Sequence, residues 1–282
     1  MSILVGHMSK TIPLFTTIGL TCFDINKTPT ETSIMPGGAV FFASIAASTV
    51  LQPVGLVTKV GYDFDTTYLT QKGILAEGIS IVSDKPTDTA ILKYLDKLDL
   101  TQRSIETNFD ISMTLEPKDI PKTFLDSRII HIGTTPPVIQ ARFLPYLREH
   151  SKALISIDSD SIFLDNPDHR DQALANLQNA DIVFLNRKEQ ASVDTQLLSE
   201  KELILKLDKE GALVQRRDKT LAETKVNSDL PAKDPTGAGD ILAGSYLASR
   251  ALGKAPQESL DTAVALATRS VTQNGINHLF AT

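Results

Sequence analysis

The sequence contains almost no cysteine and no long apolar or basic segment. Cys22 is the only cysteine among 282 residues, so no disulfide can form within the chain, which suits a reducing, cytoplasmic compartment. No apolar run reaches the roughly 18 residues that a membrane-spanning helix needs. Basic tracts are absent as well, and the net charge is −6. We therefore expect neither a nucleic-acid partner nor a membrane partner.

The phosphate-binding pattern G-x-x-x-x-G-K-[ST] of P-loop kinases is also missing. What is present is a globular composition, 41% hydrophobic and 22% charged, over a length that fits one large α/β domain or two ordinary ones. Residues 1–9 include Gly6-His7-Met8, which is typical of a cloning junction. We expect a leader or tag remnant there and a folded domain over residues 10–282.

Short apolar strands alternate with helical segments along most of the chain, which predicts an α/β fold with a parallel sheet covered by helices on both faces. Residues 22–36 and 87–113 are β-rich and partly alternating, and they predict a small separate sheet. Asp63 is predicted to cap a helix. The predicted strands span residues 12–20, 53–60, 128–133, 154–158, 181–186 and 203–207, and the predicted helices 66–78, 140–150, 172–179 and 260–272.

Two glycines precede an apolar helix of small residues in the segment Asp234-Pro235-Thr236-Gly237-Ala238-Gly239-Asp240. Backbone N–H groups of such a loop, together with the positive end of the helix, form a site for an anion, most often a phosphate. Asp240 falls in the first helical turn, where it could serve as a general base that takes a proton from an attacking hydroxyl. The alternative is a plain helix N-terminus, with Gly for turning and Asp for capping.

Other polar and glycine residues lie near expected element ends. Asp24 follows a strand, where ligands of an open α/β sheet gather, or it only stabilises its own turn. Gly37 and Gly38 precede a helix and allow a ligand to approach the backbone, or they form a hinge or a turn. Asn186 and Glu189 share one face of a helical turn, and their oxygens suit Mg2+, or they are an ordinary surface pair.

The segment DPTGAGD, Asp234 to Asp240, resembles the signature of the ribokinase-like sugar kinases, the PfkB family. Gly37-Gly38 resembles the first signature of that family, and Asn186-x-x-Glu189 resembles its N-x-x-E motif. The resemblance extends from residue 12 to residue 276. It implies a ribokinase-like three-layer α/β/α sandwich with a mostly parallel central sheet. It also implies a small β-sheet lid, formed by about residues 22–36 and 87–113, that excludes water from the reaction.

The resemblance implies that the γ-phosphoryl group of ATP is transferred to a hydroxyl of a small sugar, polyol or nucleoside. Asp240 would be the base, and the N–H groups of Gly237, Ala238 and Gly239 would form the anion hole. Mg2+ would be held by Asn186 and Glu189 through water. Two chains would pair through their lids as a homodimer. The implied acceptor contacts are Asp24, Gly37, Gly38 and the lid residue Arg103.

The resemblance also implies which residues contact the nucleotide and which bind a monovalent cation. The implied nucleotide contacts are Asn186, Lys206, Gly211, Gly237, Gly239 and Asn274, and the implied ligands of a monovalent cation such as K+ are Asp234 and Thr236. Lys206 and Asp208 stand where relatives carry the Thr and the first Gly of a T-x-G-x-x-G motif. How the nucleotide is held is therefore less well predicted than the reaction.

Two further departures bear on the substrate. The D-x-N-x-R motif of relatives is reduced here to Asp158, because Asp160 and Ile162 replace its Asn and Arg. Phe42 stands where sugar-specific members often carry Asn, which weakens a ribose or fructose assignment. The alternatives are a myo-inositol or nucleoside kinase of the same superfamily, or a catalytically weak relative that binds a sugar or nucleotide in a regulatory role.

Overall fold

The computed structural model describes residues 11–29, 31–94, 103–226 and 233–272. It contains a large sheet with the strand order β14-β13-β12-β11-β10-β9-β1-β4-β5, and β6 also pairs with β4. Only the β12–β13 and β13–β14 pairings are antiparallel. The strands are β1 (Phe15–Ile18), β4 (Val54–Gly61), β5 (Ile74–Leu75), β6 (Ile79–Val82), β9 (Ile129–Ile132), β10 (Leu154–Asp158), β11 (Ile182–Asn186), β12 (Glu202–Lys206), β13 (Ala212–Arg216) and β14 (Lys219–Thr224).

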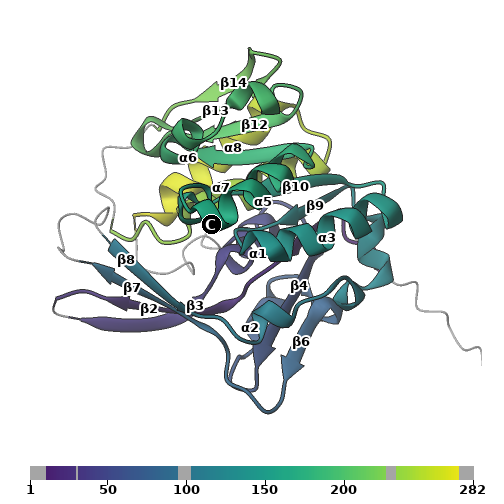
Figure 1. The fold of residues 1–282 in the computed structure, drawn as a ribbon. Helices are drawn as coiled ribbons and strands as arrows, with labels where there is room; N and C mark the ends of the chain where they lie inside the picture. Colours follow the sequence, from purple (N-terminus) through teal and green to yellow (C-terminus); the bar gives the residue numbers. More distant parts are fainter. Residues whose placement is uncertain (1–10, 30, 95–102, 227–232, 273–282) are drawn as a thin grey trace, which may run out of the picture.

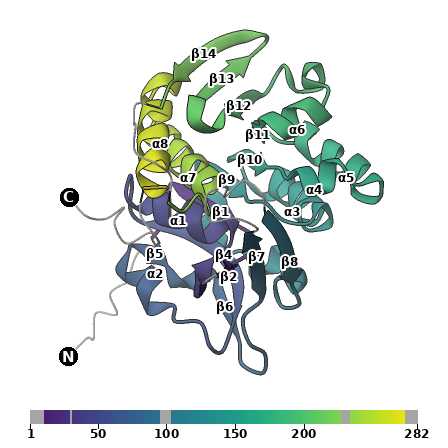
Figure 2. The ribbon, with the colours of Figure 1, turned by 90° about the vertical axis from the view of Figure 1, so that its left-hand side faces the viewer.

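Helices cover both faces of the large sheet, as an apolar parallel sheet requires. They are α1 (Ala39–Ser48), α2 (Thr67–Gln71), α3 (Pro137–His150), α4 (Ser161–Leu164), α5 (Pro167–Gln178), α6 (Arg187–Ser192), α7 (Ala238–Ala251) and α8 (Pro256–Ser270). Figure 2 shows α1, α7 and α8 on one side of the sheet and α3 to α6 on the other. The predicted α/β/α sandwich with a mostly parallel sheet is confirmed.

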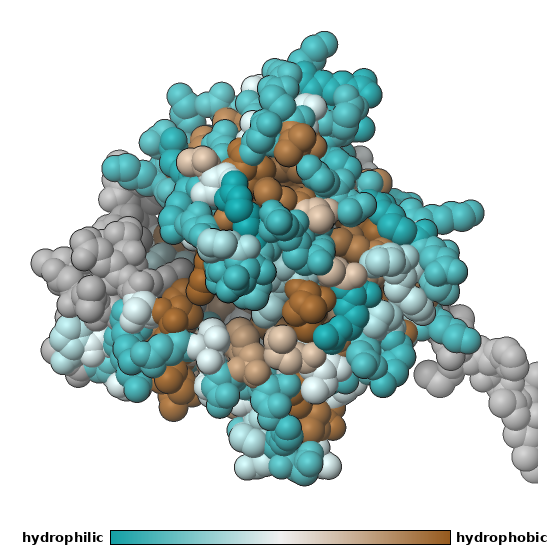
Figure 3. All heavy atoms as spheres, viewed as in Figure 1, coloured by the Kyte–Doolittle hydropathy of each residue, from teal (hydrophilic) through white to brown (hydrophobic). Residues whose placement is uncertain are grey.

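The apolar core forms two clusters, one on each face of the large sheet. Helices α1 and α7 pack closely where Gly244 faces α1. A Cβ atom at Gly244 would lie 2.0 Å from the carbonyl oxygen of Ala43, so only glycine leaves room there. On the face drawn in Figure 3, hydrophobic residues are broken into separate spots among hydrophilic ones. Among the described residues, no helix combines the length and the apolar character that crossing a bilayer demands.

A small second sheet stands apart from the large one (Figure 1). Its order is β3-β2-β7-β8, in which only β2 and β7 are parallel. Asp24 lies within this sheet rather than in a loop after β1. That two chains pair through the sheet stays a prediction. The strands are β2 (Cys22–Lys27), β3 (Thr32–Gly37), β7 (Thr89–Tyr94) and β8 (Arg103–Asn108).

Two carboxylates fasten the small sheet to the body of the protein. Asp63 Oδ1 accepts hydrogen bonds from the backbone N–H and the hydroxyl of Thr87, at 2.8 and 2.7 Å. Asp88 accepts from the backbone N–H groups of Asp110, Ile111 and Ser112, at 2.8–3.1 Å. The prediction that Asp63 caps a helix is therefore wrong, because its carboxylate is engaged by the segment that leads into β7.

Several element boundaries also differ from the predicted ones. The helix predicted over residues 66–78 ends at Gln71, because Gly73 with φ +79° turns the chain into β5. Helices α3, α5 and α8 begin three to five residues earlier than predicted. Each of them starts at a proline, whose fixed φ and missing N–H suit the first helical position.

Candidate active site

Three neighbouring parallel strands end at one edge of the large sheet with a polar residue. Asp158 is the last residue of β10, Asn186 of β11 and Lys206 of β12. Strands β10, β11 and β12 pair in parallel, and Asn186 lies directly opposite Lys206 in the register. Ligands of open α/β sheets bind at the carboxyl ends of the strands. The topology therefore gathers these three residues where a ligand is expected.

Lys206 and Asp158 form an ion pair across this edge. The Lys206 Nζ atom lies 2.7 and 2.9 Å from the two carboxylate oxygens of Asp158, and the two side chains are 15% and 1% exposed. Burial lowers the pKa of the Lys206 ammonium, but the carboxylates of Asp158 and Glu189 outweigh burial and raise that pKa above its ordinary value. Lys206 is therefore positively charged at neutral pH.

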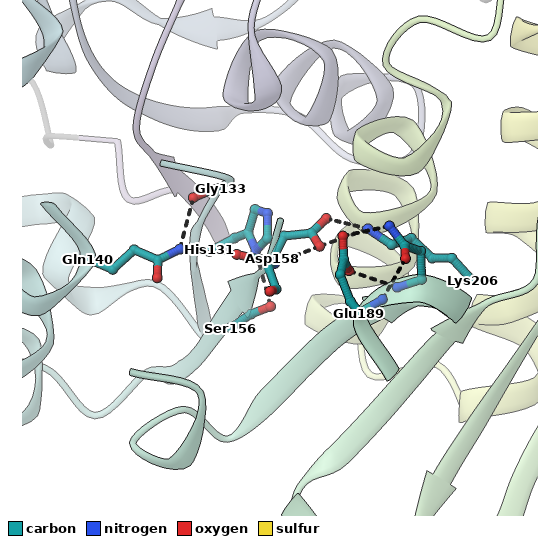
Figure 4. A network of polar contacts seen from close by, with 9 residues as sticks. His131, Gly133, Gln140, Ser156, Asp158, Glu189 and Lys206 are labelled. Atoms are coloured by element: carbon teal, nitrogen blue, oxygen red, sulfur yellow. Dashed lines mark hydrogen bonds and ion pairs between the residues drawn. The ribbon is translucent and has the colours of Figure 1, made fainter. Parts of the chain in front are cut away.

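Asn186 and Glu189 begin α6 as a reciprocal capping box. The Asn186 side chain accepts a hydrogen bond from the Glu189 N–H, and the Glu189 carboxylate accepts one from the Asn186 N–H. Burial raises the pKa of Glu189 to about 7, against the pull of Lys206. Figure 4 shows Glu189 beside the Lys206–Asp158 pair. The pair is thus not an ordinary surface pair, because Glu189 is buried, and the capping box holds both side chains at the strand ends.

Asn186 and Glu189 can hold Mg2+ only together with further ligands, such as waters and the phosphates of a substrate. The structure describes no group of three or more His, Cys, Asp or Glu side chains that could hold a metal ion. Mg2+ commonly binds through one or two carboxylates and keeps several waters, alongside the phosphates of a substrate. Glu189 is buried, and its raised pKa shows that its negative charge is under-compensated. A hydrated Mg2+ therefore fits Glu189, with Asn186 fixing the carboxylate.

The predicted anion-binding loop leads into α7. Gly237 is the N-cap residue in the left-handed conformation, with φ +73°, and Ala238 is the first helical residue. A Cβ atom at Gly237 would lie 2.4 Å from the ring of Phe42. The Phe42 ring packs against the loop at Gly237. It is only 3% exposed and therefore offers little surface to an acceptor.

Asp240 lies in the first turn of α7, partly exposed yet set among other acidic groups. Burial raises the pKa of Asp240 well above its ordinary value, Asp158 and Asp24 add to the shift, and Lys206 opposes it. A carboxylate that is reachable but poorly solvated is a strong base, so the position suits proton abstraction.

Asp24 of β2 and Gly37 of β3 contact each other directly. A Cβ atom at Gly37 would lie 2.1 Å from the Asp24 carboxylate, so only glycine leaves room for that side chain. The Cys22 thiol donates to Asp24 Oδ1 at 3.4 Å. Gly38 begins α1 with φ +93°, and a Cβ atom there would lie 2.6 Å from the carbonyl oxygen of Leu20. The glycine pair is thus required by packing, whatever ligand it contacts.

The remaining predicted contacts are less informative. Gly211 has φ +104° and packs against the Thr224 carbonyl, which explains the glycine structurally. Asp234 Oδ1 accepts from the Thr236 N–H at 3.0 Å within its own turn. Arg103 begins β8, but its side chain lies outside the described residues, as does Asn274. Their roles toward nucleotide, acceptor and K+ stay predictions.

The prediction from sequence missed the Asp158–Lys206 pair. Lys206 was expected as a nucleotide contact and Asp158 was noted as the remnant of a family motif, but the two were not expected to pair. A signal was available, because each ends an apolar strand and the two strands are separated by one strand in the predicted order. Opposite charges at the ends of nearby parallel strands could have been paired on that ground.

His131, in β9, gives a prediction for stability. Its Nδ1 lies 3.1 Å from the Ser156 hydroxyl, and the side chain is fully buried (Figure 4). Burial, with help from Lys206, lowers the pKa of His131 to about 3. The unfolded chain takes up a proton near pH 6.5 and the folded protein does not, so stability falls as the pH drops from 6.5 toward 3. At pH 5 the loss from this group is about 2 kcal/mol.

Urea unfolding at pH 7 and pH 5 tests this expectation. The variant His131→Gln should lose about 2 kcal/mol less than the wild type between the two pH values. His169→Gln, at an exposed position on α5, controls for the removal of a histidine. An equal pH dependence in wild type and His131→Gln would contradict the prediction.

Known proteins are similar to the chain over most of its length. The model of the pfkB family carbohydrate kinases matches residues 12–281. The chain is 25% identical over 242 residues to the cytidine kinase of Thermococcus kodakarensis, which covers 79% of this chain and 83% of that protein. The nucleoside kinase of Methanocaldococcus jannaschii has a similar structure, with 19% identity, a TM-score of 0.78 and 94% of both chains covered.

Two structures of a ribokinase II from E. coli are similar as well. Without ligand that protein has 23% identity and a TM-score of 0.79, and in complex with ATP and Mg2+ it has 22% identity and a TM-score of 0.76. Each comparison covers 94% of both chains. At these identities the likeness shows the fold, and the family match adds the activity class. The chain belongs to the PfkB family of carbohydrate kinases and is a phosphotransferase.

Proposed function

We propose that this kinase transfers the γ-phosphoryl group of ATP to a hydroxyl of a small sugar, polyol or nucleoside, with Asp240 as the general base. The observation that carries the proposal is the position of Asp240. It lies in the first turn of α7, next to the anion-binding loop, and burial raises its pKa. A base beside a phosphate site is what hydroxyl phosphorylation needs.

The chain's own residues account for the main steps. Asp24 would hold the acceptor, with Gly37 and Gly38 giving it room near the backbone. Asp240 would orient the attacking hydroxyl and take its proton. The N–H groups of Gly237 and Gly239 would bind the charge on the transferring group, and that of Ala238 would join them by giving up its hydrogen bond to the Pro235 carbonyl, which is 3.2 Å long.

Mg2+ would be held at Glu189 through water, with Asn186 fixing the carboxylate. When bound, it would offset the negative charge of the nucleotide phosphates. The E. coli ribokinase II structure with ATP and Mg2+ supports this pair of ligands for the family fold.

The acceptor class rests on the relatives. The likeness to a cytidine kinase and to a nucleoside kinase favours a nucleoside over a free sugar. The structure adds that Phe42, where sugar-specific members often carry Asn, lies under the loop and provides no hydroxyl contact. We therefore place nucleosides first and sugars and polyols second.

A panel of acceptors tests the proposal. ATP consumption should be stimulated by at least one of cytidine, adenosine, ribose, fructose and myo-inositol in the presence of Mg2+. The phosphorylated product is identified by mass, so that ATP hydrolysis is not mistaken for transfer. Tight binding of one of these compounds without any turnover would favour the regulatory relative over the kinase.

A further inference from the structure

Lys206 is placed next to the anion-binding loop as well as to Asp158. A Cβ atom built on Gly239 would lie only 3.5 Å from the Lys206 Nζ atom. The ammonium group is therefore beside the first turn of α7. Its side chain keeps 15% of its surface exposed, so it is not sealed from a ligand.

A positive charge next to a helix N-terminus is unfavourable unless an anion joins them. The ion pair with Asp158 compensates Lys206 on one side. On the side of Gly239, the ammonium and the partial positive charge of α7 converge on one place. Such a place is well suited to a group that carries several negative charges.

The charges around Asp240 are mostly negative, which makes the nearby positive charge of Lys206 important for binding a phosphoryl group. In the described part of the chain, the carboxylates of Asp158, Asp24 and Asp160 and the ammonium of Lys206 are the charges that shift its pKa. The negative charge of these carboxylates would repel a phosphoryl group bound beside Asp240. Lys206 is the positively charged side chain in that set.

We propose that Lys206 is a further catalytic residue, whose ammonium contacts the transferring phosphoryl group opposite the N–H groups of α7. Asp158 is its positioning residue, because both carboxylate oxygens hold the ammonium in place. The proposal rests on the proposed function, and it goes beyond a general nucleotide contact. Lysine acts here as a point charge, which suits a group whose charge is spread over three oxygens.

A purely structural role is the competing interpretation. The ion pair would then tie β10 to β12 across β11 and do nothing else. Lys206→Met alone cannot separate the two interpretations, since it leaves Asp158 buried without its partner and risks unfolding. The double variant Asp158→Asn/Lys206→Met removes both charges of the ion pair, so the net charge at this edge of the sheet is unchanged.

The experiment compares turnover in the double variant, in Asp158→Asn and in Lys209→Met with the wild type. Lys209 is exposed and lies three residues after Lys206, which makes it a matched control for the loss of one lysine. The acceptor is whichever of cytidine, adenosine, ribose, fructose and myo-inositol is phosphorylated. All variants are first checked for cooperative thermal unfolding.

We expect the double variant to lose about 100-fold in kcat, as removal of one donor to a transition-state oxyanion does. Asp158→Asn should lose about tenfold in kcat with an unchanged KM for the acceptor, because the ammonium remains but is less well held. Lys209→Met should match the wild type. A folded double variant with kcat within threefold of the wild type would overturn the proposal.

A second readout needs no acceptor. Calorimetric titration with ATP and with AMP compares ligands that differ in the β- and γ-phosphates. The double variant should bind ATP about tenfold more weakly and AMP as the wild type does. Equal affinities for ATP in both proteins, or an equal loss for ATP and AMP, would overturn the role of Lys206. If no acceptor is turned over by the wild type, the proposed function fails, while this titration still decides the role of Lys206.

Discussion

Asp240→Asn is expected to lower kcat by a factor of about 10² to 10⁴ and to leave ATP binding nearly unchanged. A positioned general base contributes a factor of this size, and the amide of Asn cannot take a proton. The N–H groups of the loop and the Lys206 side chain are not altered by the exchange, so the phosphates keep their partners. Steady-state kinetics give kcat, and calorimetric titration gives the affinity for ATP. Turnover close to that of the wild type would contradict the assignment of Asp240 as the general base.

The pH dependence and the stability of the same variant separate chemistry from misfolding. Burial first, and then Asp158, raise the pKa of Asp240, so the acid limb of the wild-type kcat profile should lie above the ordinary range of an aspartate. Asp240→Asn should lack that limb in its residual activity.

The sign of the stability effect follows from the same shift. A carboxyl group with a raised pKa in the folded state stabilises the fold only while it is protonated. That contribution is present below the unfolded pKa, near 3.8, and is lost as the pH rises through the folded pKa. Above the folded pKa the ionised Asp240 therefore opposes folding. Asp240→Asn should be at least as stable as the wild type in urea, and a clear loss of stability would argue against this account.

Gly237→Ala is expected to reduce kcat by about 100-fold or more. Alanine in the left-handed conformation costs about 1 to 2 kcal/mol. In addition, its Cβ atom would lie 2.4 Å from the Phe42 ring, which is buried in α1 and has no room to withdraw. The loop must therefore move, and a displacement of about 1 Å at a reacting group is enough for a loss of this size. Steady-state kinetics with the acceptor identified from the panel measure the effect.

Gly253→Ala is the matched control for this variant. Gly253 also has a left-handed backbone, with φ +88°, and a Cβ atom there would meet nothing within 4 Å. It follows α7 at the end opposite to the site. We expect the same backbone cost of about 1 to 2 kcal/mol in urea unfolding and an unchanged kcat. If both variants lost activity equally, the contact between Gly237 and Phe42 would not be the cause.

The sequence by itself determined the architecture and the position of the candidate site along the chain. The alternation of short apolar strands and helices predicted the parallel sheet, and the segments 22–36 and 87–113 predicted the small one. The loop before α7 could be identified because its glycines and Asp240 lie within one short segment. Asn186 and Glu189 could be singled out in the same way, since they lie only three residues apart, although their capping box was not predicted. These features depend on local spacing, which a sequence shows directly.

Only the tertiary structure decided which distant residues meet. Asp158 and Lys206 are 48 residues apart, and they pair because β10 and β12 flank β11 with their carboxyl ends at the same edge. Phe42 supports Gly237 because α1 and α7 pack tightly against each other. Asp63 binds Thr87 instead of a helix end because the chain returns there to enter β7. In each case the contact depends on strand order and helix packing, which the pairing of the whole sheet sets and no single segment encodes.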